Sequence, residues 1–596
     1  MTSVAECDVI VVGSGAGGLA TAVTAAKGGL KVIVLEKEAL FGGTTARSGG
    51  VLWIPCNPKS RELGIDDSVE QARRYLRHEA AAHYDAARID AFLDNGPRMV
   101  RFFESETAVQ FVAVPEFPDY HPDVPGGKDG GRSIVAAPYD AGALGRDAKR
   151  LRPPLREITF VGMMFNASQE VAHFFNVTRS LSSAVYVVRR LLQHSLEMLR
   201  HGRAQRLTNG NALVARLARS AFDAGVEIRT GARVERLLVV DGRVRGVALA
   251  TDGQAQELHA RQGVVLATGG FPQDPELRGQ LFPHAPHFSP APPGNTGDGW
   301  RLAQTVGGQA VRSLPNHAAW IPVSLVPRGN GQSGVYPHLL DRYKPGIIAV
   351  DPGGRRFTNE ANSYHDVGQA MQAACAGRPE TFAWLVADHR AIRRYGLGYV
   401  KPFPLPLWPH LRSGYLKRGR TPAELATALG LDATPFAHTI EAFNRTALAG
   451  LDPAFGKGAT SYNRYLGDKH HHPNPCVAPL DRGPYYAVKL LMGDLGTFAG
   501  IRTDERARVL KDDGSPIPGL FAVGNDALSV MGGTYPGAGI TLGPAMTFGY
   551  IAGRHLVAQA HVPEPSQHLH EQEDGSAWGP RETPRPTPSQ HAERHT

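Results

Sequence analysis

A glycine-rich turn between two apolar runs near the N-terminus limits most strongly what this chain can fold into. The runs Val9–Val12 and Lys31–Leu35 are almost wholly apolar, which is typical of strands in a parallel sheet covered on both faces. Between them stand the sequence GSGAGG at residues 13–18 and a segment of helical character, Leu19–Ala26. The order strand, glycine turn, helix, strand predicts a βαβ unit whose helix begins at the glycines.

The spacing of the glycines assigns a ligand to this unit. Gly13 permits a tight turn, Gly15 lets the backbone approach a pyrophosphate at the helix N-terminus, and Gly18 lets the helix pack closely on the sheet. Glu36 follows the second strand and can accept hydrogen bonds from ribose hydroxyls. The strand, the helix and the acid together predict a dinucleotide-binding site, while leaving NAD and FAD both open.

Three further segments favour FAD over NAD. The sequence GGTTARSGG at residues 42–50 has small and hydroxyl side chains that allow the chain to run along a flat ring and its phosphates. The apolar run 263–267 ends in Thr268-Gly269-Gly270, a second close backbone approach. The run 519–523 ends in Gly524-Asn525-Asp526, where an amide or acid can bind the ribityl chain. Since no second GxGxxG follows a strand, we expect no tightly bound NAD(P)H.

Composition and charge exclude several classes of protein. The net charge of +8 over 596 residues is a mild bias, so we expect no nucleic-acid partner. The four cysteines form no CxxC pair, and the sequence HHH at 470–472 lacks a spaced carboxylate or cysteine, so we expect neither a disulfide framework nor a metal site. No apolar run reaches 18 residues, and the N-terminus lacks a basic signal region, so we expect a cytoplasmic protein.

An amphipathic helical segment near 166–206 allows two interpretations. Apolar residues recur there every three or four positions with arginines between them. The segment is either an inserted helical hairpin packed on the body of the protein or a basic face that rests on a membrane. The repeating residues are Val185, Val188, Leu192, Leu196 and Leu199, with Arg189, Arg190 and Arg200.

Six segments carry a resemblance to a known family. GSGAGG, GGTTARSGG, VVLATGGF, RRFTNE, GLFAVGN and TYPGAGITLGPA resemble the fumarate reductase/succinate dehydrogenase flavoprotein superfamily (the FAD-dependent oxidoreductase 2 family). Within it they are most similar to the 3-ketosteroid dehydrogenases, particularly the Δ1 enzymes. The likeness covers nearly all of residues 5–560 and implies FAD as the cofactor.

The resemblance implies an α/β fold, with a Rossmann-like FAD-binding domain and an inserted α+β catalytic (capping) domain. We expect the FAD-binding domain over 1–282, with a helical insertion at about 155–205, and again over 481–562. The catalytic domain is expected over 283–480 and a disordered tail over 563–596. The expected cofactor-binding residues are Gly13, Gly15, Ala16, Gly17, Gly18, Glu36, Lys37, Gly43, Thr44, Thr45, Ser48, Gly49, Gly50, Val234, Thr268, Gly269, Gly524, Asn525, Gly539, Thr541 and Leu542.

The chemistry of such an enzyme needs three groups. A ketone beside a CH–CH bond loses its α proton to a base and its β hydrogen as hydride to flavin N5, while donors hold the developing enolate oxygen. The sequence YPGAG at 535–539 places a phenol and a backbone N–H on one loop, and the resemblance assigns Tyr535 and Gly539 to the ketone oxygen. It also makes Tyr364 the proton-abstracting base and places Tyr120 beside it.

The substrate class follows from what the same loop lacks. Fumarate reductases clamp two carboxylates with His and Arg near this position, but residues 532–536 contain neither, which favours a neutral apolar ketone. We therefore expect C1–C2 dehydrogenation of ring A of a 3-ketosteroid, with Δ4-dehydrogenation or fumarate reductase-like enoate reduction as alternatives; a flavin-binding protein without catalytic activity is a further alternative. The expected partners are the steroid, a quinone as electron acceptor and peripheral contact with a membrane. Candidates to line an apolar cleft are Trp320, Phe403, Leu405 and Trp408, although core packing explains them equally well.

Overall fold

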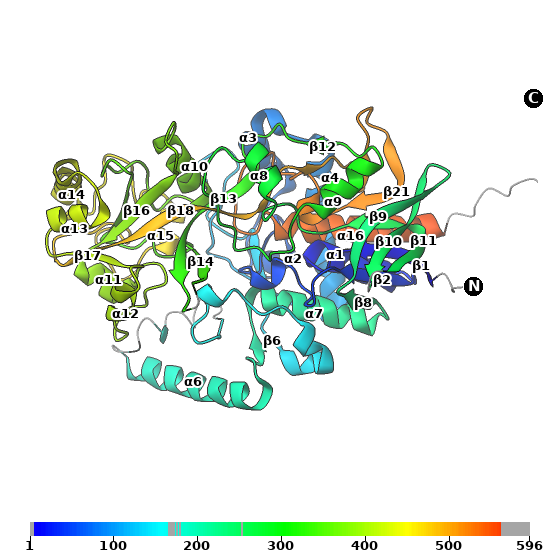
Figure 1. Cartoon of the computed structure of the whole chain (residues 1–596), viewed down its shortest axis with the longest axis horizontal. Coiled ribbons are helices and arrows are strands. Elements are labelled where there is room, and N and C mark those ends of the chain that lie inside the picture. The colour runs from blue at the N-terminus through cyan, green and yellow to red at the C-terminus, as the bar shows by residue number, and fades with distance from the viewer. Residues whose placement is uncertain are drawn as a thin grey trace, which may run out of the picture.

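The computed structural model describes residues 5–164, 173–174, 177, 180–251, 254–329 and 331–561. The tail expected over 563–596 and much of the segment between 165 and 179 lie outside the described residues. The described chain is built around two large sheets (Figure 1).

The first sheet has a parallel core that begins with the predicted βαβ unit. β1 pairs in parallel with β2 on one side and with β11 on the other, and β8 and β21 extend the sheet at its two sides. Helix α1 (Ala16–Lys27) connects β1 to β2. The strands of the parallel core are β1 (Ala5–Val12), β2 (Val32–Glu36), β8 (Glu227–Thr230), β11 (Gln254–Leu266) and β21 (Pro516–Ala522).

The two faces of this sheet are covered differently. Val9 and Val11 of β1 belong to the core shared with α1, whereas Ile10 and Val12 pack on the side of the β9–β10 hairpin. Because both sets of side chains are buried, the strand is apolar at every position. The covering elements are α4 (Ala86–Glu106), α7 (Asn209–Asp223), α16 (Leu542–Ala560), β9 (Arg233–Val240) and β10 (Arg243–Thr251). β20 (Arg508–Leu510) pairs antiparallel with β21 at the edge of the sheet.

The second sheet is antiparallel and is centred on one long strand. β18 (Tyr485–Thr497) pairs with β13, β16 and β17, so the chain rejoins the first sheet only after Thr497. The Thr497 hydroxyl donates to the Asn525 carbonyl at 3.3 Å, which joins the end of β18 to the glycine turn after β21. The other strands of this sheet are β13 (Ala318–Pro327), β14 (Ser333–Pro337), β15 (Ile347–Val350), β16 (Phe382–Ala387) and β17 (Lys417–Gly419).

Helices flank the second sheet, and short elements connect the two halves. α10 (Tyr364–Ala374) packs on β13, and Ser363 caps its N-terminus by accepting from the Asp366 N–H. The remaining helices are α2 (Pro58–Glu62), α3 (Val69–Ala80), α8 (Pro275–Leu281), α9 (Asp298–Thr305), α11 (His389–Tyr395), α12 (Trp408–Arg412), α13 (Pro422–Leu429), α14 (Ala433–Ala447) and α15 (Ser461–Leu466). The remaining strands are β3 (Val51–Trp53), β4 (Phe111–Ala113), β5 (Ser133–Ala136), β6 (Tyr139–Asp140), β7 (Arg206–Leu207), β12 (Ala310–Val311) and β19 (Gly500–Ile501).

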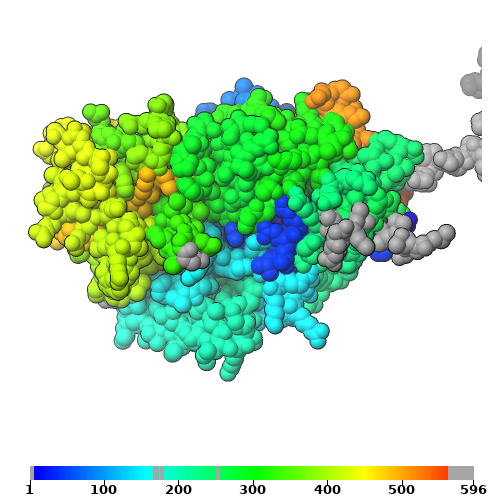
Figure 2. Space-filling model, in the orientation of Figure 1, coloured from blue at the N-terminus to red at the C-terminus, as the bar shows by residue number. Residues whose placement is uncertain are grey.

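The predicted helical insertion contains one long helix at the edge of the molecule. α6 (Leu181–His201) lies along the lower edge in Figure 1, and Figure 2 shows the same edge as a surface. Val187, Arg190 and His194 face inward, whereas the repeating apolar residues face solvent, up to 84% exposure at Leu199. The helix therefore buries a mixed face and leaves its apolar stripe, which we define as Leu181, Val185, Val188, Leu192, Leu196 and Leu199, uncovered by the described chain.

Candidate functional site

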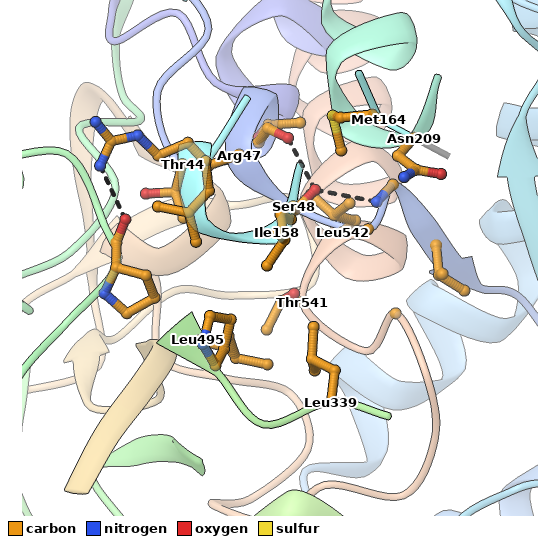
Figure 3. Close-up of a pocket in the computed structure, with 18 of the residues that line it drawn as sticks. Thr44, Arg47, Ser48, Ile158, Met164, Asn209, Leu339, Leu495, Thr541 and Leu542 are labelled. Atoms are coloured by element: carbon orange, nitrogen blue, oxygen red, sulfur yellow. Dashed lines mark hydrogen bonds between the residues drawn. The ribbon is translucent and has the colours of Figure 1, made fainter. Parts of the chain in front are cut away.

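A cavity of about 1360 Å³ extends from the glycine turn of the first sheet to the second sheet. Drug-sized ligands usually occupy about 300–1,000 Å³, so this cavity has room for a dinucleotide together with a substrate. Every predicted cofactor-binding residue lines it except Gly18. Figure 3 shows part of its wall, where Thr44, Arg47 and Ser48 lie near residues of the insertion and of the C-terminal loop.

The glycine turn has the geometry that its spacing predicts. Gly13 has a φ of +112°, and a Cβ there would stand 2.1 Å from the Ala267 carbonyl oxygen. A Cβ on Gly18 would stand 2.2 Å from the Gly13 oxygen, which accounts for its place in packing rather than in the cavity wall. A Cβ on Gly15 would meet only Thr45 Oγ1, at 3.6 Å. The backbone at Gly15 is thus open to a ligand, as a pyrophosphate site requires.

The acid after β2 lies in the cavity wall. Glu36 is buried and lines the cavity, and its carboxylate accepts from the Ser14 hydroxyl at 2.5 Å. The Ser14 oxygen in turn accepts from the Gly42 N–H at 2.9 Å, which joins the first glycine turn to residues 42–50. Lys37 lies beside Asp298, with its ammonium 2.7 Å from the carboxylate.

One buried carboxylate, which the sequence had suggested only as a group for the ribityl chain, joins the loops of the cavity wall instead. Asp526 accepts from the Thr268 N–H, the Thr268 hydroxyl and the Gly270 N–H at 2.6 to 2.9 Å. Burial raises the pKa of Asp526, whereas these bonds lower it. The bonds fix the turn after β11 against the turn after β21. Sequence alone offered only the position of Asp526 directly after Gly524-Asn525 as a signal.

Two cavity residues near the cofactor turns were also missed. Arg47 lies within the predicted 42–50 segment, lines the cavity and donates to the Pro290 carbonyl at 2.9 Å. Asn295 donates to Thr44 Oγ1 and to the Gly269 carbonyl, both at 3.0 Å. The arginine within the glycine run was a signal for Arg47, whereas nothing in the sequence marked Asn295.

Three tyrosines that are far apart in the sequence meet at the cavity wall. The Tyr120 hydroxyl donates to the Tyr364 oxygen at 3.0 Å. The rings of Tyr120 and Tyr535 are stacked with centroids 5.4 Å apart, and the ring of Tyr364 stands edge-on to Tyr535 at 5.0 Å. All three are buried and line the cavity. The structure thus brings together the predicted base, its neighbour and the predicted ketone-binding phenol.

Burial sets the protonation state of these phenols. It raises the pKa of Tyr120 and of Tyr364 well above the usual value; Tyr535 raises both pKa values further, whereas the hydrogen bond from Tyr120 lowers that of Tyr364. It raises the pKa of Tyr535 to about 12, with hydrogen bonds to Tyr364 and Thr541 acting in the opposite direction. At neutral pH Tyr535 is therefore a protonated donor, and Tyr364 needs help to lose its proton.

The loop that carries Tyr535 is held tightly against β3. Gly539 has a φ of +98°, and a Cβ there would stand 2.4 Å from the Val51 oxygen. Its carbonyl accepts from the Trp53 N–H and the Gly543 N–H, while its own N–H has no acceptor among the described residues. Gly539 also lines the cavity. A backbone donor at this position is available to a ligand oxygen.

The apolar candidates divide into three groups. Phe403 and Leu405 line the cavity and are partly exposed. Trp320 is buried in the core of the second sheet, and Trp408 is 61% exposed and does not line the cavity. Met164, Val187 and Leu191 of the insertion also line the cavity, and no sequence pattern indicated that the insertion would reach it.

These features define a flavoprotein that holds FAD beside a phenol-lined substrate space. Residues 8–542 match the family described as FAD binding domain. The chain belongs to this family and is an FAD-dependent oxidoreductase of the 3-oxosteroid dehydrogenase type, which confirms the predicted family and cofactor. No helix of the described residues is long and apolar enough to cross a bilayer.

Relatives of known activity resemble the chain over nearly its whole length. It is 44% identical to the 4-oxocyclohex-2-ene-1-carboxylate 5-dehydrogenase of Sinomonas cyclohexanicum over 94% of this chain and 95% of that protein. It is 37% identical to a 3-oxosteroid 1-dehydrogenase of Mycolicibacterium smegmatis over 93% and 98%. The structure of the 3-ketosteroid delta1-dehydrogenase of Sterolibacterium denitrificans with 1,4-androstadiene-3,17-dione superposes with a TM-score of 0.85 at 35% identity, covering 93% of this chain and 100% of that one. These similarities confirm the mixed α/β FAD-binding fold.

Proposed function

We propose that this protein introduces the C1–C2 double bond into ring A of a 3-ketosteroid. The observation that carries the proposal is the contact of Tyr364 with Tyr120 and Tyr535 on the wall of the FAD-binding cavity. The relatives named 3-oxosteroid 1-dehydrogenase support the steroid as substrate. FAD, when bound, supplies the acceptor for the hydride that leaves the β carbon.

The side chains divide the work between proton removal and charge stabilisation. Tyr364, as a phenolate, removes the proton next to the ketone and becomes a neutral phenol, and the Tyr120 hydroxyl stabilises the phenolate before this step by donating to it. The Tyr535 hydroxyl and the Gly539 N–H donate to the ketone oxygen, on which negative charge develops. Donors of this kind typically contribute about 100- to 1,000-fold in rate each. The buried position of the phenols excludes water from the reacting atoms.

A second candidate substrate is a smaller cyclic oxo acid. Two relatives, at 44% and 38% identity, are named as dehydrogenases of 4-oxocyclohexene- and 4-oxocyclohexanecarboxylate. Such a substrate presents the same ketone beside a CH–CH bond, so the same tyrosines would serve it. We propose the steroid first because the cavity is large and the substrate end is lined by apolar groups such as Leu339, Phe403 and Leu405.

Bleaching of the bound flavin tests the proposal and separates the candidates. The holoenzyme is mixed anaerobically with androst-4-ene-3,17-dione or with 4-oxocyclohexanecarboxylate, and the product is identified by mass and NMR. We expect rapid bleaching by the steroid and a 1,4-diene product; a 4,5-desaturated product from a saturated 3-ketosteroid would instead identify Δ4 chemistry. Tyr364→Phe should retain FAD and lose bleaching. Bleaching by neither ketone, or oxidation of the reduced flavin by an enoate alone, would overturn the proposal.

We further propose that the protein contacts a lipid surface with the face around the cavity mouth. Five exposed apolar side chains from four segments are part of the cavity wall, beside the exposed ion pair of Lys469 with Glu116. The apolar stripe of α6 continues this face, and exposed Arg189 and Arg200 beside it suit anionic headgroups. The five mouth residues are Val112, Val188, Leu340, Phe403 and Leu405.

Flotation with vesicles tests this contact. We expect the holoenzyme to float with anionic vesicles and Leu192→Glu/Leu196→Glu to remain at the bottom with unchanged FAD content. Dimerisation of the wild-type protein that the same double substitution abolishes, without flotation, would refute the lipid surface in favour of a second copy. A quinone dissolved in the lipid is the electron acceptor that fits this placement, and turnover with a vesicle-bound quinone measures it.

We also propose a division into a Rossmann-like FAD-binding domain and a capping domain. The parallel order β8-β2-β1-β11-β21 supports the first, and the antiparallel sheet supports the second. The boundary expected at 480 is better placed after β18, because that strand belongs to the second sheet.

A further inference from the structure

His121 joins two carboxylates directly behind the tyrosine cluster. Its Nδ1 lies 3.0 Å from Glu79 Oε1 on α3, and its Nε2 lies 3.1 Å from Asp366 Oδ2 on α10. Both ring nitrogens face acceptors, so the arrangement is satisfied when both carry protons. Burial alone would lower the pKa of His121, but the bonds to Asp366 and Glu79 raise it to about 10. At neutral pH the bridge is therefore an imidazolium between two carboxylates.

This bridge ties together the three segments that carry the tyrosines. His121 follows Tyr120 directly, and Asp366 lies two residues after Tyr364 in the first turn of α10. The carbonyl of Pro536, next to Tyr535, accepts from the Tyr120 N–H at 2.9 Å and from the Tyr75 hydroxyl at 2.6 Å.

The Tyr75 oxygen completes the connection by accepting from the His121 N–H at 3.3 Å. Both Tyr75 and Glu79 lie on α3, so one helix holds the loop of Tyr120 at two points. Breaking the bridge removes the ion pairs that hold this loop to α3 and α10, and leaves Tyr120 placed by its bond to Tyr364, by the bond to Pro536 and by ring packing on Tyr535.

None of the three bridging residues touches the cavity. His121, Glu79 and Asp366 are absent from its wall, whereas Tyr120, Tyr364 and Tyr535 line it. We propose that His121 is a positioning residue, whose imidazolium holds Tyr120 against Tyr364 and keeps a positive charge next to this phenol pair. The inference rests on the proposed function, in which Tyr364 is the base.

The charges of His121 and Glu79 act in opposite directions on the ionisation of Tyr364. Glu79 and Asp366 bring two negative charges and His121 one positive charge, so the bridge carries a net charge of −1. Of the other groups packed there, Tyr75 on α3 is protonated, and burial lowers the pKa of His365 on α10 to about 4, so it is neutral. Removing the charge of His121 makes a Tyr364 phenolate harder to form, and removing that of Glu79 makes it easier.

Two variants with opposite expected shifts test the inference. In His121→Gln we expect kcat to fall about 100-fold, because a 1 Å misplacement can cost that much, while KM and FAD content stay unchanged. The pH at which kcat rises should move up in His121→Gln and down in Glu79→Gln. The control is His78→Gln, an exposed histidine on α3 next to Glu79, which should keep the wild-type kcat. Wild-type kcat in His121→Gln, or a shift of both variants in the same direction, would overturn the inference.

A measurement without turnover separates this inference from the proposed function. The tyrosinate absorbance of the holoenzyme is titrated with base for the wild type, His121→Gln and Glu79→Gln. The curve of the same protein with Tyr364→Phe added is subtracted from each, which leaves the titration of Tyr364. Because His121 loses its own proton near pH 10, below the range in which Tyr364 titrates, we expect the Tyr364 titration to move down in Glu79→Gln and to stay in place in His121→Gln, even if no ketone bleaches the flavin. If the Tyr364 titration is unchanged in both variants, the charges of the bridge do not affect the ionisation of Tyr364, whichever ketone is the substrate.

Discussion

Replacing Gly539 by alanine tests whether the Tyr535 loop supplies the ketone-binding donors. The added Cβ would stand 2.4 Å from the Val51 oxygen and 2.6 Å from the Val51 carbonyl carbon, both rigid backbone atoms of β3. Ordinary van der Waals contact begins at 3.4 Å, so the loop must move by about 1 Å. A displacement of this size at reacting atoms costs about 100-fold in rate, or about 2.7 kcal/mol of transition-state stabilisation.

The strained backbone adds a cost to stability that a control can isolate. A non-glycine residue at the Gly539 φ of +98° costs about 1–3 kcal/mol. Gly29 has a φ of +91° with nothing within 4 Å of its built Cβ, so Gly29→Ala carries the strain without the collision. We expect both variants to unfold at lower denaturant concentration and only Gly539→Ala to lose turnover.

The assay is dye-coupled oxidation of the ketone substrate, with FAD content measured by absorbance in the same samples. We expect kcat/KM of Gly539→Ala to fall about 100-fold at full FAD occupancy. If Gly539→Ala stays within threefold of Gly29→Ala, the Gly539 N–H does not hold the ketone oxygen and the assignment of this loop fails.

Four other outcomes are expected. Tyr535→Phe should lower kcat about 100- to 1,000-fold with FAD retained, because a buried O–H donor is lost; a fall in affinity alone, seen as raised KM, would contradict this. Glu36→Gln should weaken FAD retention during gel filtration, because one acceptor for a ribose hydroxyl becomes a donor; unchanged retention would place the ribose elsewhere. Asp526→Asn should lower the free energy of unfolding by about 1–3 kcal/mol and release FAD, since an amide cannot accept all three bonds. The raised pKa of His121 makes its stabilisation complete below pH 6.5 and lost as pH rises to about 10, so urea unfolding should show this decline in the wild type and not in His121→Gln.

The parts of the fold that depend on neighbouring residues could be predicted from the sequence. The packing at Gly18 is local, because the atom nearest its Cβ is the Gly13 oxygen of the same βαβ unit; at Gly13 the nearest atom is the Ala267 oxygen, directly after β11, but the spacing of the glycines already marks the turn. The apolar strands and the helix between them follow from periodicity for the same reason. The sheet to which β18 belongs depends on strands 66 to 179 residues away, and no local pattern determines that pairing.

The tyrosine cluster illustrates the same limit in the site. Tyr120 and Tyr364 are 244 residues apart, so their contact could be expected only from family resemblance and not from spacing. Asp526 and His121 act through bonds to other chain segments; the glycine turn marks the position of Asp526 but not its bonds, and no motif marks His121. The amphipathic pattern of α6 predicted a helix but could not say which face it buries, because the inward face carries Arg190 and His194 instead of the apolar stripe.

The hydrogen bond from Thr497 to Asn525 links the two halves of the cavity mechanically. β18 runs through the centre of the second sheet and ends on the turn that borders the cofactor space. A Cβ on Gly270 would stand 2.0 Å from Thr497 Oγ1, so the turn after β11 packs closely against the same contact. A rotation of the second sheet that widened the substrate side would therefore either break this bond or displace the turn at Asn525.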